Sequence, residues 1–400
     1  MIETVNISLL LLCGVAFALA ASLFLLHRIF SNSTSTTLAN VQLITNWPDL
    51  PQGWWTDSER FQTEKRAIFS QTWICASHRS RFVKAGDYIA FDIAGFRALL
   101  MLGKDGTVRA FHNICRHRAF PVAKKASGSS TVLGCRYHGW SYDTKGQLTK
   151  APHFDNVPGF EKSQNGLFPI HTRMDDGGFI HVNMSASEAA GDEDALHIKK
   201  TSQLAGISQN SHFIDSWEVK GNFNWKAIVS DSQQTFQTPT TDGISRLFSA
   251  KDSMPTGPQR LGLLTTISSK PSSPLWYQVT YSPDSVGQTT VRCDVYSTKK
   301  PDPHAFDSNT KASLKEQIQA LVHQHEGIYT KLAGPDFNAL SGGYEQAKIS
   351  DMVDAHLEKE KLQGQEIKPA AIQQQCRSAA YMQAEGICKA MECGSEELAW

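Results

Sequence analysis

Two cysteine–histidine pairs constrain this sequence more than any other feature in it. Cys115 and His117 form the first pair, Cys135 and His138 form the second, and 17 residues separate the two pairs. A fold that brings these segments together places two thiols and two imidazoles around one point. Thiolate and imidazole are protein ligands for zinc and iron. The spacing therefore predicts a metal centre held between two loops.

Two kinds of metal centre use two cysteines and two histidines. A structural zinc ion takes all four in a tetrahedron, and zinc fingers place both cysteines before both histidines. In a Rieske 2Fe-2S cluster, two thiolates bind one iron and two neutral imidazoles bind the other. The order here alternates, Cys115, His117, Cys135, His138. This order favours one 2Fe-2S cluster per chain, with these four residues as metal ligands and cofactor-binding residues.

The sequence around the two pairs has the pattern of short antiparallel strands. Residues 88–93, 98–102 and 108–111 are apolar or alternating, and Lys-Asp-Gly at 104–106 separates the second from the third. Such runs joined by a glycine turn predict hairpins. We expect a small antiparallel β domain over residues 72–185.

The remainder reads as a second, α+β domain built from residues 46–71 and 195–400. Strands are expected near residues 261–267, 276–281 and 290–297, and helices over residues 224–236, 312–331, 349–362 and 371–391. Strands followed by helices are typical of an α+β arrangement.

The first segment differs in composition from the rest of the chain. Residues 7–26 form a 20-residue run without a charge, which is long enough to span a bilayer. A secretory signal peptide is the alternative, but its positive start is missing, since Glu3 precedes the run and Arg28 follows it. We expect an uncleaved transmembrane anchor, a flexible tether over residues 27–45, and a single-pass membrane protein with its soluble domains in the cytosol.

Charge and cysteine content exclude several classes of protein. Lys plus Arg and Asp plus Glu both total 39, which gives no electrostatic pull toward nucleic acid. The 8 cysteines show no even framework, so we expect no disulfide scaffold. The sequence shows no Gly-rich dinucleotide fingerprint after a strand, so electrons are expected from a separate reductase.

The loops that carry the four ligands resemble a known family. Residues 108–123 and 134–147 are similar, almost residue for residue, to the cluster loops of Rieske-type non-haem iron oxygenases. Residues 54–82 resemble the choline-monooxygenase-like group, of the aromatic-ring-hydroxylating oxygenase alpha-subunit type. The resemblance implies a Rieske domain set before or within a larger helix-grip (START-like) α+β domain of catalytic type. It also implies a homo- or hetero-oligomer with a trimer-like ring, in which the cluster of one chain serves the iron of the next.

The resemblance implies a second metal site, which this sequence does not reproduce. The family binds a mononuclear Fe(II) through Asp/Glu-x-x-His-x4-His and a later acid. Counted without a gap from Asn-Trp-Lys at 224–226, these positions fall on Gln234, Gln237 and Asp242. A glutamine offers iron only a neutral amide oxygen. Glu326 is the candidate for the third ligand, and we expect the mononuclear iron to be lost.

A relocated iron site that uses His323, His325 or Asp242 is the alternative. Three functions follow from these residues. The expected one is a membrane-anchored Rieske oxidoreductase, oxygenase-like, that acts on a hydrophobic small molecule in specialised metabolism. The others are an electron-donating partner subunit of an active paralogue, and a cluster-bearing protein whose oxygenase-type domain binds or rearranges a small molecule without activating oxygen.

Overall fold

The computed structural model describes most of the chain after residue 49. The described residues are 50–51, 53–154, 160–187, 189, 199, 202–203, 205–230, 258–269, 273–300, 306–334, 344–369, 382 and 386. All of them belong to one compact unit, Trp47–Trp400. The expected anchor over residues 7–26 and the tether over residues 27–45 lie outside the described residues.

The membrane location expected from the sequence is corrected by the structure. Across the described part of the chain, we find no helix that is both long enough and apolar enough to cross a bilayer. The single-pass membrane protein with cytosolic domains is therefore not retained.

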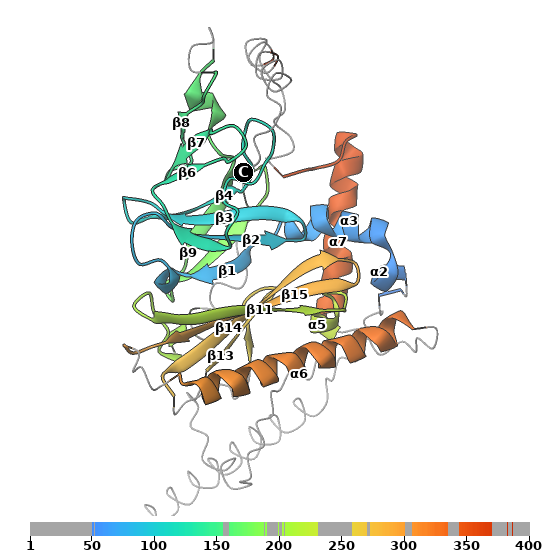
Figure 1. Ribbon diagram of the computed structural model, residues 1–400. Helices are drawn as coiled ribbons and strands as arrows, with labels where there is room; N and C mark the ends of the chain where they lie inside the picture. The colour runs from blue at the N-terminus through green and yellow to red at the C-terminus, as the bar shows by residue number, and fades with distance from the viewer. Residues whose placement is uncertain are drawn as a thin grey trace, which may run out of the picture. The chain divides into compact units, whose positions relative to one another are not determined.

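The first sheet lies above the second in the view of Figure 1, and the loop with Cys115 and His117 follows one of its strands. Within the described residues it is antiparallel and seven-stranded, in the order β1-β10-β9-β4-β3-β2-β5. Its strands are β1 (Ile74–His78), β2 (Asp87–Ile93), β3 (Phe96–Leu102), β4 (Val108–His112), β5 (Ser127–Ser129), β9 (Pro169–Met174) and β10 (Phe179–Asn183). A smaller sheet, β6-β7-β8, consists of β6 (Val132–Gly134), β7 (Ser141–Asp143) and β8 (Leu148–Lys150). Three short 3-10 or π turns accompany these strands and the helix before them: η1 (Lys65–Phe69), η2 (Arg79–Arg81) and η3 (Lys162–Asn165).

The hairpins predicted around the first cysteine pair are confirmed. The expected strands at residues 88–93, 98–102 and 108–111 lie inside β2, β3 and β4. The β3–β4 turn contains Gly106 at φ 79°, a left-handed conformation that glycine adopts without strain. Alternating apolar residues and a glycine turn were sufficient to predict these strands, because each strand pairs with its neighbour in sequence.

The second sheet is built mostly from later strands. Its order in the described residues is β11-β15-β14-β13-β12, all antiparallel. Its strands are β11 (His212–Gly221), β12 (Gln259–Arg260), β13 (Thr265–Ser269), β14 (Leu275–Ser285) and β15 (Gln288–Ser297). The strands expected at residues 276–281 and 290–297 are confirmed within β14 and β15. The strand expected at residues 261–267 is wrong in its bounds, because Gly262 at φ 70° turns the chain between β12 and β13.

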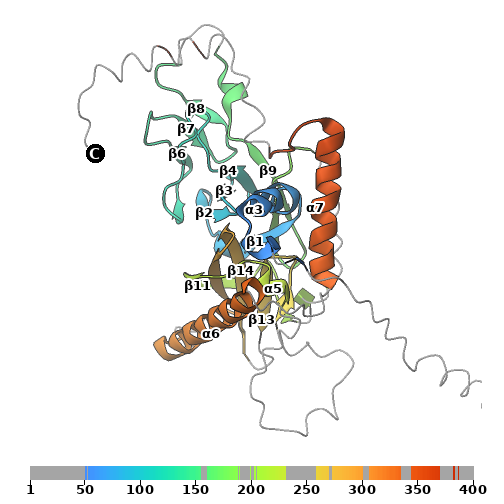
Figure 2. The same cartoon turned by 90° about the vertical axis from the view of Figure 1, so that its right-hand side faces the viewer.

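Helix α6 (Ser308–Ala333) lies along the face of the second sheet that is turned away from the first sheet (Figures 1 and 2). Asp307 caps its start by accepting a hydrogen bond from the Thr310 amide at 2.8 Å. Leu314, Ile318 and Leu321 form its buried stripe, with the spacing of one helical face. The helix predicted over residues 312–331 is thus confirmed, and so is that over residues 349–362, which lies within α7 (Tyr344–Gln363).

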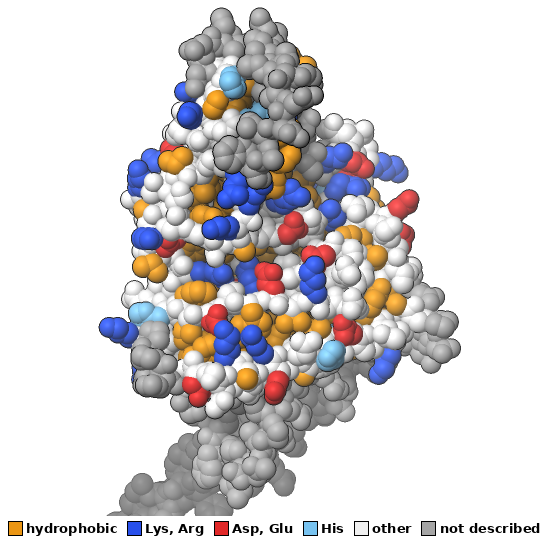
Figure 3. Space-filling view, in the orientation of Figure 1, with side chains coloured by type: hydrophobic (Ala, Val, Ile, Leu, Met, Phe, Trp, Pro, Cys, Tyr) orange, Lys and Arg blue, Asp and Glu red, His pale blue; other side chains and the backbone are white. Residues whose placement is uncertain are grey.

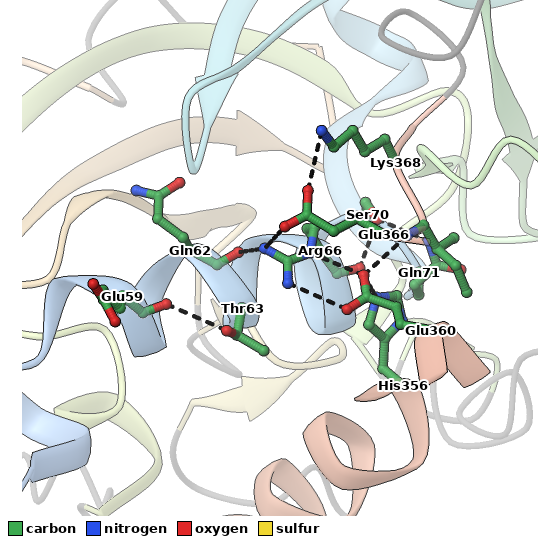
Figure 4. A network of polar contacts seen from close by, with 11 residues as sticks. Glu59, Gln62, Thr63, Arg66, Ser70, Gln71, His356, Glu360, Glu366 and Lys368 are labelled. Carbon is green, nitrogen blue, oxygen red and sulfur yellow. Dashed lines mark hydrogen bonds and ion pairs between the residues drawn. The ribbon is translucent and has the colours of Figure 1, made fainter. Parts of the chain in front are cut away.

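Short helices before the first sheet pack on these later helices. They are α2 (Gly53–Thr56) and α3 (Ser58–Glu64), which continue into η1, and they lie near α7 (Figure 2). Arg66 donates two hydrogen bonds to Glu360, at 2.9 and 3.2 Å, and His356 lies 3.1 Å from the same carboxylate (Figure 4). This network joins η1 to the end of α7. The helix expected over residues 371–391 lies outside the described residues, apart from residues 382 and 386.

The described surface carries charges of both signs. On the face shown in Figure 3, Lys and Arg side chains are interspersed with Asp, Glu and hydrophobic side chains. Such mixing matches the equal totals of 39 cationic and 39 anionic residues in the whole chain. Interspersed charges produce weaker long-range fields than a surface of one sign.

Candidate functional site

Two loops with the same backbone geometry carry the four predicted ligands. The amides of Cys115 and Cys135 each donate to a carbonyl five residues later, both at 2.7 Å. Each cysteine carbonyl also accepts from the amide four residues later, which is Ala119 at 3.0 Å and Gly139 at 2.9 Å. Ala119 and Gly139 both adopt positive φ, 58° and 73°. The two loops are therefore equivalent backbone turns, although the histidine follows its cysteine by two residues in the first loop and by three in the second.

The two cysteine sulfurs meet at the buried side of the site. Cys115 and Cys135 are 2% and 3% exposed, and their side chains hydrogen-bond to each other. The hydrogen bond from Cys115, together with the backbone amides of Tyr137 and His138, lowers the pKa of Cys135 to about 6. The pKa of Cys115 is raised, because that thiol retains the shared proton. Amides directed at a sulfur favour the thiolate, which is the form that binds metal.

The two histidine rings meet next to the sulfurs. The ring centroids of His117 and His138 lie 4.4 Å apart. His117 is 1% exposed and stacks on Trp140, with 5.1 Å between centroids and 9° between the ring planes. Phe154 approaches the same ring edge-on at 5.2 Å. Aromatic packing thus fixes the buried imidazole, whereas His138 lies nearer to solvent.

The pairing of these side chains distinguishes the two kinds of metal centre. In the part of the chain that the structure describes, no three His, Cys, Asp or Glu side chains converge as they would around a single metal ion. The two thiols contact each other, and the two imidazole rings contact each other. A two-iron cluster needs this division, since one iron takes both sulfurs and the other takes both imidazoles. The residues fit a Rieske cluster better than a tetrahedral zinc ion.

Two polar side chains that the sequence did not single out support the loops. The Tyr142 hydroxyl lies 3.3 Å from Cys115 Sγ and accepts from the Arg116 amide at 3.0 Å. The Asn113 side chain makes two hydrogen bonds of 2.8 Å with the backbone of Ala123, at the far end of the first loop. A buried amide paired with a backbone in this way closes the loop rigidly. Tyr142 is visible in the sequence as part of an aromatic strand, but its contact with Cys115 depends on strand register.

The tip of the two loops carries an exposed aromatic pair. Phe120 and Tyr137 are 43% and 49% exposed, and their rings stack at 4.3 Å. Tyr137 also contacts the His138 ring at 4.0 Å. The partly exposed His138 ring is therefore covered in part by an exposed aromatic side chain.

The second site expected from the sequence lies mostly outside the described residues. Gln234, Gln237 and Asp242 belong to residues 231–257, which the structure does not describe. Residues 224–226, from which these positions were counted, are described and buried. Lys226 Nζ lies 2.7 Å from Glu64 Oε1, and Trp225 Nε1 donates to Glu64 Oε2 at 2.8 Å. These contacts hold the start of α5 (Ala227–Ser230) against α3.

Glu326, the candidate third ligand, is engaged in local contacts. One carboxylate oxygen accepts from the Asn222 amide at 2.8 Å, and the other lies 3.0 Å from His323 Nδ1. The Asn222 hydrogen bond lowers the pKa of Glu326. His325 instead lies in the core beside Phe223, and burial lowers its pKa to about 4. Within the described residues, His323, His325 and Glu326 do not converge on one metal position.

Comparison with known families identifies the segment of the chain that carries the four predicted ligands. The family described as Rieske [2Fe-2S] domain matches residues 72–161. These residues include all four predicted ligands and both equivalent loops. A Rieske domain implies a 2Fe-2S cluster.

Curated relatives extend the similarity beyond this domain. The chain is 30% identical over 188 residues to the carnitine monooxygenase oxygenase subunit of Acinetobacter baumannii, which covers 46% of this chain and 50% of the relative. The glycine betaine monooxygenase oxygenase subunit of Pseudomonas aeruginosa is 25% identical over 187 residues, 47% of this chain and 43% of the relative. The matches thus span about half the length of these relatives. Their names give no support to a hydrophobic substrate from specialised metabolism.

Solved structures show that the fold extends further than the sequence match. The quaternary ammonium Rieske monooxygenase CntA superimposes with a TM-score of 0.61 at 21% identity, over 77% of this chain and 94% of that chain. Naphthalene 1,2-dioxygenase from Rhodococcus sp. gives a TM-score of 0.60 at 17% identity, over 74% of this chain and 85% of that chain. The Rieske match and the curated relatives show that the chain carries a Rieske domain of the type found in Rieske non-haem iron oxygenases, and the solved structures add that the surrounding fold is shared.

Proposed function

We propose that the chain is a Rieske-type oxidoreductase that holds one 2Fe-2S cluster and relays single electrons. Cys115 and Cys135 would bind one iron, and His117 and His138 would bind the other. The observation that carries the proposal is the division of these four side chains into a sulfur pair and an imidazole pair. When bound, such a cluster accepts and releases one electron at a time.

The residues around the proposed cluster suit this role. Trp140 and Phe154 cover the inner imidazole and exclude water from it, and a dry surrounding shell influences the potential of a metal site. Tyr142 holds the first loop by its contacts with Cys115 and the Arg116 amide. His138 lies at the outer edge of the site, where an electron carrier could approach it.

We also propose the domain division that this function requires. Residues 72–185 would form the Rieske domain, and residues 46–71 with 195–400 would form the oxygenase-type domain. The separate hydrophobic core that contains Cys115, Cys135 and Trp140 supports this division. The buried Glu64–Lys226 contact, which ties α3 to α5, supports assigning the first segment to the second domain.

The proposed electron path involves other chains. A separate reductase would supply the electrons, since the sequence carries no dinucleotide fingerprint of its own. A solved quaternary ammonium Rieske monooxygenase is described in terms of inter-subunit electron transfer. We propose the same oligomeric principle for this chain, with the cluster of one copy serving a neighbouring chain.

A second candidate function is an electron-donating subunit without its own mononuclear iron. The sequence places Gln234, Gln237 and Asp242 where the family has its acid and two histidines. The position of Glu326 supports this candidate, because both of its oxygens are engaged by Asn222 and His323. Such a chain would deliver electrons to the iron of an active paralogue.

Iron and acid-labile sulfide per chain, with an electron paramagnetic resonance spectrum of the reduced protein, test both candidates. About two irons per chain with a Rieske signal are expected for a cluster alone, and about three for a cluster plus mononuclear iron. His138→Ala should abolish the signal, whereas the control His212→Ala, which changes an exposed histidine on β11, should retain it. A normal Rieske signal in His138→Ala would overturn the ligand assignment.

A further inference from the structure

A pocket of about 400 Å³ opens between helix α6 and the second sheet, away from the cluster loops. Its floor is formed by side chains of β14 and β15, among them Leu275, Tyr277 and Val295. Ligand pockets in proteins commonly enclose about 300–1,000 Å³. The pocket is therefore large enough for a small organic molecule.

The rim of the pocket comes from one face of α6. Asn309, Ser313 and Gln317 line it and follow each other at intervals of four residues, so they lie on the same side of the helix. All three are exposed, whereas Leu314 between them is buried and belongs to the floor. The rim offers amide and hydroxyl groups that both donate and accept hydrogen bonds.

Every described residue that lines the pocket is uncharged. The two lysines nearest in sequence are engaged on β11: Lys311 pairs with Asp215 at 2.5 Å, and Lys315 lies 5.9 Å above the Trp217 ring. A charged group moved from water into a site without a countercharge loses a large part of its hydration energy. The pocket thus favours a molecule without net or separated charges.

The pocket is distinct from the position of the candidate iron ligand. Gln317 precedes His325 by eight residues on α6, which corresponds to about 12 Å along the helix. A molecule held between Asn309 and Gln317 therefore lies more than two helical turns from Glu326. Occupation of the pocket does not require a metal there.

We propose that this pocket is a binding site for an uncharged small molecule with an apolar body and several oxygen or nitrogen atoms along one edge. The body packs on Leu275, Tyr277 and Val295, and the polar edge faces the amides and hydroxyl of the α6 rim. This assignment goes beyond electron relay and holds for either proposed function. It also predicts that quaternary ammonium compounds, such as the carnitine in the name of a relative, do not occupy this pocket.

Two fluorescent dyes with the same ring skeleton test the charge preference on the full, cluster-loaded chain. N-phenylnaphthylamine is uncharged, and anilinonaphthalene sulfonate adds one sulfonate. The uncharged dye should bind saturably with one site per chain, and the sulfonate should bind at least about tenfold more weakly because its charge finds no partner. Carnitine should not displace the uncharged dye. Equal binding of the two dyes, or displacement by carnitine, would overturn the proposal.

Variants of exposed α6 residues locate the binding to the pocket without altering the core. Ser313→Trp should fill the mouth and remove the saturable signal, whereas Gln319→Trp, on the same helix outside the pocket, should leave it unchanged. Gln317→Arg adds a cation to the rim and should reverse the preference, so that the sulfonate becomes the tighter ligand. Dye binding that is insensitive to both Ser313→Trp and Gln317→Arg would show that the dye lies elsewhere and refute the site.

Discussion

The buried pair formed by Glu64 and Lys226 gives the strongest single test of how α3 is held against the start of α5. Both side chains are 0% exposed, and the ammonium lies 2.7 Å from the carboxylate. Glu64→Gln keeps the shape and the hydrogen-bond acceptor but leaves the ammonium buried without a countercharge. Removal of one partner of a buried ion pair typically costs about 3–5 kcal/mol. We expect the free energy of unfolding to fall by that amount near neutral pH.

The pKa of Lys226 determines how the lost stability of Glu64→Gln depends on pH. Burial lowers the pKa of Lys226, and the charge of Glu64 opposes that effect. Without the carboxylate the pKa of Lys226 should fall further below its unfolded value of about 10.4. Between the two values the unfolded chain binds more protons than the folded chain, so stability rises with pH. The difference between the wild type and Glu64→Gln should therefore narrow as the pH rises toward 10.

Guanidinium denaturation followed by tryptophan fluorescence at several pH values measures both effects. The double variant Glu64→Gln with Lys226→Met removes the stranded charge and should recover much of the loss. Glu59→Gln changes an exposed carboxylate of the same helix and should cost less than about 1 kcal/mol. Two results would refute the reasoning. One is a fall in the free energy of unfolding of less than about 1 kcal/mol in Glu64→Gln. The other is a difference between wild type and Glu64→Gln that does not narrow as the pH rises.

Three further predictions concern the cluster loops and the α7 contact. Tyr142→Phe removes the hydroxyl 3.3 Å from Cys115 Sγ, so the cluster should remain but its reduction potential, measured by redox titration, should fall relative to wild type. Asn113→Ala breaks two 2.8 Å hydrogen bonds with the Ala123 backbone. It should accelerate the loss of iron to a chelator while leaving the initial iron content unchanged. An unchanged rate of iron loss would contradict the proposal that Asn113 closes the first loop. For Glu360, burial raises the pKa, but the hydrogen bonds from Arg66 and the Ile367 amide, together with the charges of Arg66 and His356, leave the pKa lowered. Glu360→Gln should therefore cost about 1.5–3 kcal/mol at neutral pH. That difference should vanish as the pH falls through the lowered pKa, and denaturation curves that stay apart in acid would contradict it.

The sequence predicted elements well where structure is decided locally. The strands β2, β3 and β4 follow one another and pair in that order, so alternation and glycine turns were sufficient. Strand β11 was missed because none of its first nine residues is fully buried and its pattern is neither apolar nor strictly alternating. It is held in place by pairing with β15, far along the chain, and a long-range partner leaves no local signal.

The proposed cluster site had a local sequence signal for the same reason. Its ligand types and spacing lie within two short loops, and the structure brings Cys115, His117, Cys135 and His138 together as two pairs. The contact of Tyr142 with Cys115 was not predictable, because it depends on the pairing of β6 with β7, in which Leu133 lies opposite Tyr142. The alternating order of the ligands already favoured the cluster over zinc, and the contacts between the two thiols and between the two imidazoles add support from the structure.

The pocket beside α6 had a sequence signal that a search for reactive residues overlooks. Asn309, Ser313 and Gln317 place neutral polar groups at every fourth position, on the face of α6 that lines the pocket, whereas Lys311, Lys315 and Glu316 lie off that face. Such groups can donate or accept a hydrogen bond with an uncharged molecule without requiring a counter-ion. Other exposed positions of the helix, such as Gln319, are also neutral, so the stripe acquires its meaning only from the floor that β14 and β15 supply. Those strands reach the helix through long-range packing, which the local sequence of α6 does not encode.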